Sequence, residues 1–318
     1  MSQAKTVRVA MTETCNAYRH MPATVADLAQ LLPKLEEVRR ANVQHTIELI
    51  GAAAKAGAQV VGLGELFTAP YFALGEISDE IARMWRGLAE DAATGPTVLE
   101  LCQTARQHGV ILVAPVYELD AATGERFNSA VLIDENGLIL GKYRKNHIPS
   151  GTNDQGTFSE TLFYGPGQAA LGNDPATNRS NSDHFPVFHT SAGCIGISIC
   201  YDRHFEGVIS TLAKNGAQIV FSPAVTFGQH SRLMWDLEFV VDAARHKLFI
   251  AGSNRKGIES PWNQKFFGAS FFAGPNGKVP SLECSAGLVM ADLNLEELSG
   301  AGSSGWDLER DARPEIYG

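Results

Sequence analysis

The sequence predicts an α/β fold in which short buried strands alternate with amphipathic helices. Runs of β-branched residues are separated by segments that carry apolar residues at helical spacing, with turn residues between them. An internal repeat supports this organisation: residues 54–61 (AKAGAQVV) recur as residues 213–220 (AKNGAQIV), 213 − 54 = 159 residues later, half of the 318-residue chain. Each copy has the pattern of a helix end, a glycine and a buried strand. The repeat favours two related halves, although such junctions also occur in unrelated α/β segments.

The first half is predicted to begin with a strand at residues 7–11, followed by a helix. Pro33 suits the first turn of that helix, because an N–H has no intrahelical acceptor there. Apolar residues recur at helical spacing from Val43 to Ala54, so one face is expected to pack on a core, and Gly57 predicts the helix end. The other elements of this half are two strands, a hairpin and a helix closed by Gly109, predicted at residues 59–64, 110–117, 127–143 and 98–105.

The second half is predicted to repeat this order, within a single domain that spans residues 1–318. Residues 168–184 are rich in Asn, Ser, Asp and Gly, which predicts a surface loop. The sequence from about residue 298 lacks periodicity and is expected to form a C-terminal tail. Five strands and one helix are predicted in this half, at residues 194–200, 218–222, 248–253, 268–273, 287–292 and 233–246.

The composition limits the classes of function. A net charge of −9 without a dense stripe of Lys and Arg argues against nucleic-acid binding and favours a small-molecule partner. No apolar run is long enough to cross a bilayer, so no membrane association is expected. The chain begins without the basic region and long apolar stretch of a secretory signal, which predicts a cytoplasmic protein.

The five cysteines indicate neither a disulfide framework nor a zinc site, because they are scattered and form no CxxC pair. A redox-sensor thiol would need a second cysteine nearby. Cys194 lies six residues before Cys200 and, on the same strand face, would be roughly 20 Å away, which is too far for a disulfide. The nine histidines include no HxH or HxxxH pair, so the sequence predicts no metal site. No other cofactor is expected.

Cys200 stands at the end of a predicted strand whose sequence, CIGISIC, alternates small residues with isoleucines. Asp202 is a candidate N-cap for the following helix, which would place the thiol near a helix N-terminus and near Arg203. Both features favour the thiolate, the nucleophilic form of cysteine. The alternative is that Cys200 is a small buried apolar residue.

A cysteine acyl-transfer site also needs a base and a cation or donor for the oxyanion. Glu65 follows an apolar strand, where loss of solvent would raise its pKa toward that of a useful base, unless it only marks the exit of the strand into water. Lys142 and Lys145 lie in GKYRKNHIP at another strand end, and either could instead be a solvated surface residue. The ends of buried strands are where open α/β sheets commonly build sites.

Together the segments GELFTAPYF (64–72), GKYRKNHIP (141–149) and ICYDRHFEG (199–207) resemble the glutamate, lysine and cysteine blocks of the nitrilase, or carbon–nitrogen hydrolase, superfamily. The resemblance extends from Val7 to about Asp292. It implies a four-layer αββα sandwich, with two face-to-face sheets and helices outside.

The resemblance also implies a catalytic set, with Glu65 as base, Lys145 as the catalytic lysine, Cys200 as nucleophile and Glu160 as an assisting glutamate at looser spacing. Glu65 would accept the thiol proton, and Lys145 with the backbone N–H of Tyr201 would hold the oxyanion. Water would then hydrolyse the thioester or thiocarbamate. The resemblance also implies that the protein forms a homodimer or a larger homo-oligomer.

Within the superfamily, the sequences of these segments are most similar to the N-carbamoyl hydrolase branch. This implies hydrolysis of an N-carbamoyl amino acid of the N-carbamoyl-β-alanine type. Arg203 resembles the arginine that binds the substrate carboxylate in that branch, but it could instead pair with Asp202 or Glu206. N-carbamoylputrescine, a simple amide or a nitrile are alternative substrates, and an inactive scaffold is the non-enzymatic alternative. The residues predicted to bind substrate are Arg203, Tyr201, Phe67, Tyr71 and His147.

Other features are expected to shape the pocket. Further aromatic residues that could form its wall are Phe72, Phe227 and Trp235, although aromatic side chains are more often plain core. Asn128 is expected to be structural. Two departures from the branch, the Phe205–Glu206–Gly207 sequence and a long segment at residues 168–184, could reshape the entrance.

Overall fold

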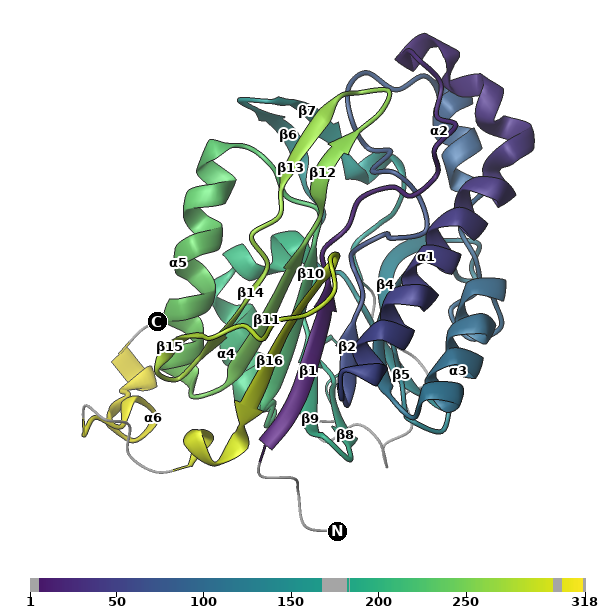
Figure 1. The fold of residues 1–318 in the computed structure, drawn as a ribbon. Helices are drawn as coiled ribbons and strands as arrows, with labels where there is room; N and C mark the ends of the chain where they lie inside the picture. The colour runs from purple at the N-terminus through teal and green to yellow at the C-terminus, as the bar shows by residue number, and fades with distance from the viewer. Residues whose placement is uncertain (1–5, 168–181, 183, 300–304, 317–318) are drawn as a thin grey trace.

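Two six-stranded sheets pack face to face, with helices covering their outer faces (Figure 1). The computed structural model describes residues 6–167, 182, 184–299 and 305–316. This arrangement confirms the predicted four-layer αββα sandwich. The predicted loop at residues 168–184 falls almost entirely outside the described residues.

The first sheet is built from the first half of the chain plus one strand from the C-terminal part. β1 pairs with β2 and β2 with β3 in parallel, and the remaining pairs are antiparallel. In the order β16-β1-β2-β3-β4-β5, its strands are Leu288–Asn294, Thr6–Thr12, Val60–Gly62, Ile111–Leu119, Arg126–Ile133 and Ile139–Arg144.

The second sheet has the same plan. β9, β10 and β11 are parallel, and antiparallel strands flank them on both sides. In the order β15-β14-β11-β10-β9-β8, its strands are Gly277–Val279, Phe271–Gly274, Phe249–Asn254, Ile219–Ala224, Gly193–Ile197 and Val187–Thr190.

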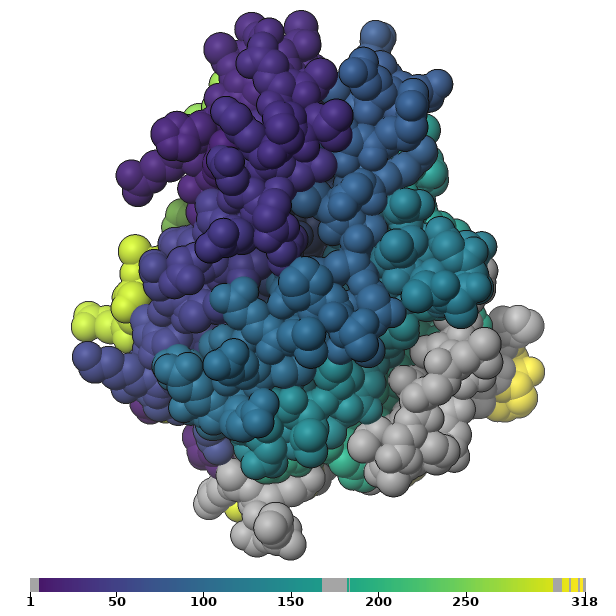
Figure 2. All heavy atoms as spheres, turned by 90° about the vertical axis from the view of Figure 1, so that its right-hand side faces the viewer, coloured from purple at the N-terminus to yellow at the C-terminus, as the bar shows by residue number. Residues whose placement is uncertain are grey.

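The helices divide between the two outer faces. α1 (Leu35–Lys55) and α3 (Pro96–His108) cover the first sheet, and Figure 2 shows that side of the molecule covered by residues of the first half, in purple and blue. α4 (Glu206–Lys214) and α5 (Gln229–His246) cover the second sheet. In the described part of the chain, no helix combines the length and apolar character needed to cross a bilayer.

β1 shows how a strand of this sandwich uses both of its faces. Val7, Val9 and Met11 belong to the core between the two sheets, whereas Ala10 belongs to the core shared with α1 and α3. All four side chains are fully buried. From Val9 to Met11 the strand is buried on both faces, which explains the short apolar run there, whereas Arg8 nearer its start is only partly buried.

The two sheets approach each other closely at a glycine. A Cβ added to Gly62, the last residue of β2, would lie 2.6 Å from Cδ1 of Phe221 on β10. The absent side chain of Gly62 therefore makes room for the aromatic ring from the opposite sheet.

The repeated sequence lies at equivalent junctions of the two halves, from α1 to β2 and from α4 to β10. Gly57 and Gly216 have φ angles of 88° and 91°, a conformation that glycine adopts without steric cost. Each glycine N–H donates to the carbonyl three residues earlier, at 2.9 and 2.8 Å. These two helices therefore end in the same way, as the repeat predicts.

The glutamines of the repeat are also equivalent. Oε1 of Gln59 accepts the N–H of Arg8 on β1 at 3.1 Å, and Oε1 of Gln218 accepts the N–H of Cys194 on β9 at 3.0 Å. In each half the glutamine side chain bonds the neighbouring parallel strand, so it helps to set the register of the central strand.

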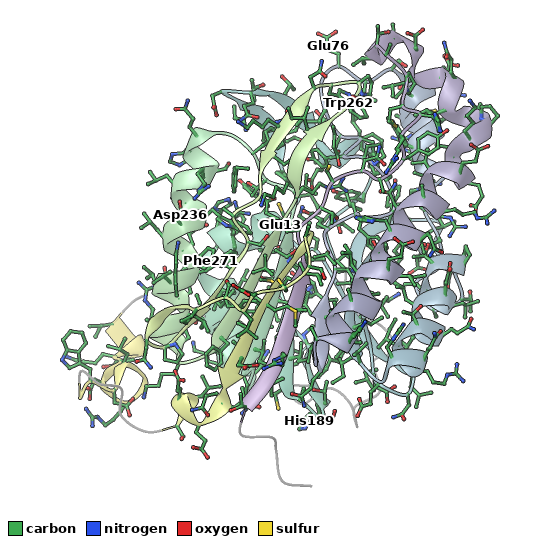
Figure 3. All side chains as sticks on the ribbon, viewed as in Figure 1. Glu13, Glu76, His189, Asp236, Trp262 and Phe271 are labelled. Atoms are coloured by element: carbon green, nitrogen blue, oxygen red, sulfur yellow. The ribbon has the colours of Figure 1, made fainter. Side chains whose placement is uncertain are left out.

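Several elements that the sequence did not predict lie beyond the carboxyl ends of the parallel strands, and the edge strands β8 and β15 of the second sheet were not predicted either. The hairpins β6–β7 (Ser150–Asn153, Gly156–Ser159) and β12–β13 (Lys256–Glu259, Gln264–Phe267) rise at this end (Figure 1). The 3₁₀ helix η1 (Val25–Lys34) and the helix α2 (Asp79–Arg86) lie there as well. Figure 3 marks this end with Glu76 and Trp262.

Two predicted boundaries need adjustment. Pro33 lies inside η1, and α1 begins only at Leu35, so the prediction that Pro33 opens the α-helix was wrong. Proline disfavours the α conformation in the residue before it, which suits a 3₁₀ segment ahead of the regular helix. The predicted C-terminal tail contains a short helix, α6 (Leu308–Asp311), in which the side chain of Asp307 accepts the N–H of Arg310 at 3.1 Å.

Candidate active site

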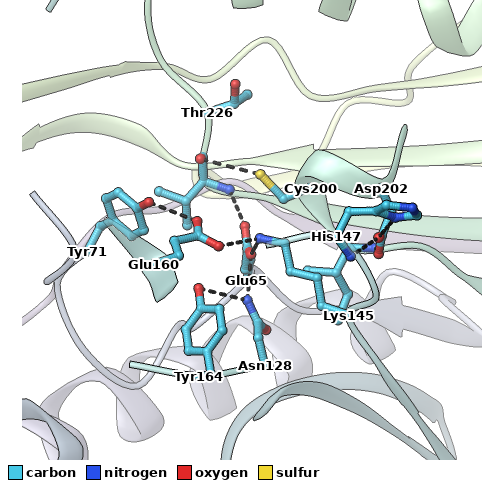
Figure 4. Close-up of polar contacts among 12 residues, drawn as sticks. Glu65, Tyr71, Asn128, Lys145, His147, Glu160, Tyr164, Cys200, Asp202 and Thr226 are labelled. Atoms are coloured by element: carbon cyan, nitrogen blue, oxygen red, sulfur yellow. Dashed lines mark hydrogen bonds and ion pairs between the residues drawn. The ribbon is translucent and has the colours of Figure 1, made fainter. Parts of the chain in front are cut away.

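The predicted catalytic side chains meet where the parallel strands of both sheets end. Glu65 follows β2 and Lys145 follows β5 in the first sheet, whereas Cys200 follows β9 in the second. Glu160 comes from the short helix η2 (Glu160–Leu162) after β7. Figure 4 shows these four side chains gathered in one place, although they are far apart in the sequence.

Three N–H donors converge on the carboxylate of Glu65, which is fully buried. Nζ of Lys145 and Nδ2 of Asn128 donate to Oε1 at 2.9 and 2.7 Å, and the backbone N–H of Val225 donates to Oε2 at 2.6 Å. Asn128 therefore positions Glu65, in agreement with its expected structural role. Bonds to both oxygens fix the orientation of the carboxylate.

Lys145 lies between two carboxylates in the buried interior. Its Nζ contacts Oε1 of Glu65 at 2.9 Å and Oε2 of Glu160 at 2.7 Å. Burial acts to lower the pKa of Lys145, but Glu160 and Glu65 outweigh it and hold the pKa well above its usual value. Lys142, the alternative candidate for the catalytic lysine, forms an ion pair with Glu118 instead. Lys145 is therefore the lysine that carries a positive charge at this site.

Glu160 is the second buried carboxylate of the site. Its Oε1 accepts the hydroxyl of Tyr71 at 2.8 Å, while its Oε2 faces Lys145. Burial raises the pKa of Glu160, and the nearby Glu65 adds to this effect, while Lys145 opposes it. Glu160 therefore takes up a proton more readily than an ordinary glutamate.

Cys200 occupies a strained turn at the start of the 3₁₀ helix η3 (Cys200–His204). Its φ angle is 50°, a left-handed conformation that is uncommon for residues other than glycine. The thiol points to the carbonyl oxygen of Val225, with Sγ at 3.6 Å. Val225 therefore contacts both the thiol, through its carbonyl, and Glu65, through its N–H.

The expectation that the surroundings of Cys200 favour the thiolate was wrong. Burial raises the pKa of the Cys200 thiol to about 12, and the negative charge of Glu65 contributes to the rise. Lys145 and Arg203 act in the opposite direction but do not outweigh burial. The resting thiol is therefore protonated, so it would need a base in order to act as a nucleophile.

Asp202 does not cap the following helix, contrary to the prediction. α4 begins only at Glu206, and the fully buried carboxylate of Asp202 turns back toward the strand. It accepts the N–H of Ile199 at 2.9 Å, the hydroxyl of Tyr143 at 2.6 Å and the N–H of His147 at 3.0 Å. Asp202 thus links the turn that carries the thiol to Tyr143 and His147, which lie two positions before and two positions after Lys145.

Arg203 is buried and adopts neither of the internal pairings that the sequence left open. Its partner is Glu238 on α5, with Nε and Oε2 3.3 Å apart, instead of Asp202 or Glu206. Nη1 donates to the carbonyl of Cys200 at 2.7 Å and lies 3.9 Å from Sγ. The guanidinium is therefore held beside the thiol.

A small pocket of about 90 Å³ opens onto the thiol. Of the residues predicted to bind substrate, Arg203, Tyr201 and Tyr71 line it. Phe67 packs in the core between the first sheet and its helices, and His147 stacks on Phe205 and contacts Asp202, so neither forms part of the lining. The complete lining consists of Tyr71, Pro149, Asn153, Phe158, Glu160, Cys200, Tyr201, Arg203, His204, Val225, Thr226, Phe227 and Ser231.

The chain is similar to known proteins over most of its length. The family model described as carbon-nitrogen hydrolase matches residues 24–301. The chain belongs to the carbon–nitrogen hydrolase family. The crystal structure of a carbon-nitrogen hydrolase from Helicobacter pylori G27 shares the fold, with a TM-score of 0.74 at 23% identity over 98% of this chain and 97% of that one.

Curated relatives of this carbon–nitrogen hydrolase include enzymes named for N-carbamoyl substrates. A β-ureidopropionase from Arabidopsis thaliana is 32% identical over 287 residues, which cover 85% of this chain but only 64% of that protein. An N-carbamoylputrescine amidase from Oryza sativa subsp. japonica is 29% identical over 295 residues, which cover 88% of this chain and 89% of that protein.

Several residues of this hydrolase site escaped the sequence analysis. Val225 acts through its backbone, which leaves no signal in residue type. Thr226 and Glu238 come from segments that resemble no predicted block, and only the fold brings them to Arg203. Across the described residues, no three His, Cys, Asp or Glu side chains are grouped so that they could hold a metal ion.

Proposed function

We propose that this carbon–nitrogen hydrolase cleaves an N-carbamoyl amino acid of the N-carbamoyl-β-alanine type, with Cys200 as the nucleophile. The products are ammonia, carbon dioxide and the free amino acid. The observation that carries the choice of substrate is the position of Arg203, whose Nη1 lies 3.9 Å from Sγ in the lining of the pocket. A guanidinium beside the reacting atom suits a small substrate with a carboxylate close to its ureido group.

In the first half-reaction, Cys200 attacks the ureido carbonyl carbon and transfers its proton to Glu65. Because the pKa of the thiol is raised to about 12, this proton has to leave during the attack. The charge of Lys145 stabilises the oxygen that becomes negative, together with the N–H of Tyr201. Glu65 then gives the proton to the leaving nitrogen, which departs as ammonia and leaves a thiocarbamate on Cys200.

In the second half-reaction, water replaces ammonia. Glu65 takes a proton from the water, the hydroxide attacks the thiocarbamate carbon, and the proton returns to the sulfur of Cys200 as the C–S bond breaks. The carbamic acid that is released loses carbon dioxide to give the amine. Glu160 supports both steps by holding Lys145 from the side opposite to Glu65.

The similarity to a β-ureidopropionase and to N-carbamoylputrescine amidases supports this substrate class. The first name implies an anionic substrate and the second a cationic one. The amino group of an N-carbamoyl diamine is cationic, and a buried arginine in the pocket wall would repel it. An N-carbamoyl acid avoids this repulsion. We therefore place the anionic compound ahead of N-carbamoylputrescine, a simple amide or a nitrile. The proposal includes a homodimer or larger homo-oligomer, which sedimentation analysis would measure.

Ammonia release from a panel of four compounds tests the proposal. The purified protein is incubated with N-carbamoyl-β-alanine, N-carbamoylputrescine, an aliphatic amide and an aliphatic nitrile, and kcat/KM is measured for each. The highest value is expected for N-carbamoyl-β-alanine. Turnover of only the amide or only the nitrile would overturn the choice of substrate while leaving the hydrolase chemistry in place.

A further inference from the structure

Glu238 contacts two residues of the pocket lining from behind. It belongs to α5, and its side chain is only 11% exposed. Oε1 lies 2.6 Å from Nδ1 of His204, and Oε2 lies 3.3 Å from Nε of Arg203. His204 and Arg203 both line the pocket, whereas Glu238 does not. The carboxylate is therefore held against the pocket wall without direct contact with its contents.

The contact between Arg203 and Glu238 is an ion pair more than a hydrogen bond. Nε and Oε2 are both buried, and neither has an aligned hydrogen-bond partner among the described residues. The other guanidinium nitrogens are used elsewhere, since Nη1 donates to the carbonyl of Cys200 and Nη2 to Oγ1 of Thr226. The role of Glu238 toward Arg203 is thus mainly electrostatic.

This pairing changes the charge that a substrate meets. Arg203 alone would present a full positive charge in a buried site, but Glu238 offsets it at 3.3 Å. A carboxylate in the pocket is attracted by Arg203 and repelled by Glu238, and a cationic amine meets the reverse. The preference for substrate charge therefore depends on both members of the pair.

We propose that Glu238 is a specificity-determining residue, which reduces the preference of the enzyme for N-carbamoyl acids over N-carbamoyl amines. This inference rests on the proposed function. Glu238 acts by compensating the charge of Arg203, and the same contact holds the guanidinium in place beside Cys200. Loss of the charge is expected to change binding of charged substrates, and any general loss of alignment is expected to affect all substrates alike.

The substitution Glu238→Gln tests this inference, because it removes the charge and nearly preserves the shape. The measured quantity is the ratio of kcat/KM for N-carbamoyl-β-alanine to kcat/KM for N-carbamoylputrescine, in which a common loss of alignment cancels. The ratio is expected to rise about tenfold, mostly through opposite changes in the two KM values. A ratio that is unchanged or lower would overturn the inference.

Glu206→Gln is the matched control, because it removes one negative charge from a nearby side chain that is 87% exposed and lies outside the pocket lining. Its ratio is expected to equal that of the wild type. Glu238→Ala keeps the test decisive if the glutamine variant does not fold, and the same rise is expected. A wild-type enzyme that cleaves neither compound overturns the proposed function as well, whereas cleavage with an unchanged ratio in the variants overturns only the role of Glu238.

Discussion

The two halves of the molecule share a junction but differ in the chemistry that follows it. In each half a helix, a left-handed glycine and a glutamine lead into the central parallel strand of a sheet. Beyond β2 the chain places the buried carboxylate of Glu65. Beyond β10 it places Val225, which contributes a peptide N–H and a carbonyl. The same local structure therefore delivers a charge in one half and neutral dipoles in the other.

This difference explains how the site remains buried without an uncompensated charge. Lys145 pairs with Glu65 at 2.9 Å and with Glu160 at 2.7 Å, and the raised pKa of Glu160 favours its neutral form. The second half provides the neutral thiol of Cys200. The peptide of Val225 joins them, since it binds Glu65 on one side and the thiol on the other. A buried ion pair is tolerated when further hydrogen bonds satisfy its members, and Asn128 and the N–H of Val225 supply such bonds to Glu65.

Substitution of the proposed nucleophile or of the proposed base is expected to have the largest effect on kcat. Cys200→Ala and Glu65→Gln should each lower kcat by at least about 10³-fold, because the nucleophile and its base act as a unit. Ammonia release in single-turnover experiments would measure the loss. Circular dichroism should show both variants folded. Retention of more than a tenth of the wild-type rate in either variant would contradict the assigned roles.

The close approach of the two sheets predicts the next largest effect. Gly62→Ala should lower the free energy of unfolding by about 1–3 kcal/mol, because the added methyl group would lie 2.6 Å from the ring of Phe221. Urea denaturation would measure the change. Gly207→Ala is the control, because a Cβ there meets no atom within 4 Å and the residue lies in α4. That variant should be as stable as the wild type or slightly more stable.

Alkylation of Cys200 probes the charges that each half contributes. Glu65 raises the pKa of the thiol, so Glu65→Gln should lower that pKa and increase the thiolate fraction at a given pH. The rate of iodoacetamide labelling at pH 8, followed by peptide mass spectrometry, should rise about tenfold for one pKa unit. Lys145→Met should slow labelling, because Lys145 lowers the thiol pKa.

Lys142→Met is the control for the lysine substitution. It removes the same charge from a side chain that contacts Glu118 outside the catalytic cluster, so the labelling rate should stay at the wild-type value. The Glu65 carboxylate could affect labelling in two ways: its charge opposes thiolate formation, and its basicity promotes loss of the thiol proton. Slower labelling of Glu65→Gln than of the wild type would show that the second effect is the larger one.

The smallest effect is expected from the repeated glutamines. Gln59→Ala and Gln218→Ala each remove one hydrogen bond to a neighbouring strand, at a cost of about 0.5–1.5 kcal/mol. The bond of Gln218 to Cys194 is partly buried, whereas that of Gln59 to Arg8 is exposed, so Gln218→Ala should cost more. Urea midpoints of the two variants would measure the difference. Equal midpoints would mean that burial does not distinguish the two junctions.

The sequence predicted most strands of the two sheets and, through the family resemblance, the four side chains Glu65, Lys145, Glu160 and Cys200 that meet at the site. Buried strands leave apolar runs, and glycine at a helix end leaves a local signal, so β1, β2, β9 and the repeated junctions were predictable. Glu65, Lys145 and Cys200 each follow a predicted strand, but it was the resemblance of the three segments around them to the carbon–nitrogen hydrolase superfamily that selected them. The small hairpins β6–β7 and β12–β13 were missed, since short segments at the surface lack a long periodic pattern.

Tertiary structure decided the electrostatics. The raised pKa of Cys200 depends on burial and on Glu65, which is 135 residues earlier in the chain (200 − 65), so the local expectation of a thiolate was wrong. The pairing of Arg203 with Glu238 joins two elements that no sequence pattern relates. Periodicity and turn residues act over a few positions and determine where strands begin and end. Solvation and charge act through space, so only the packed sheets determine which groups at those ends are buried together.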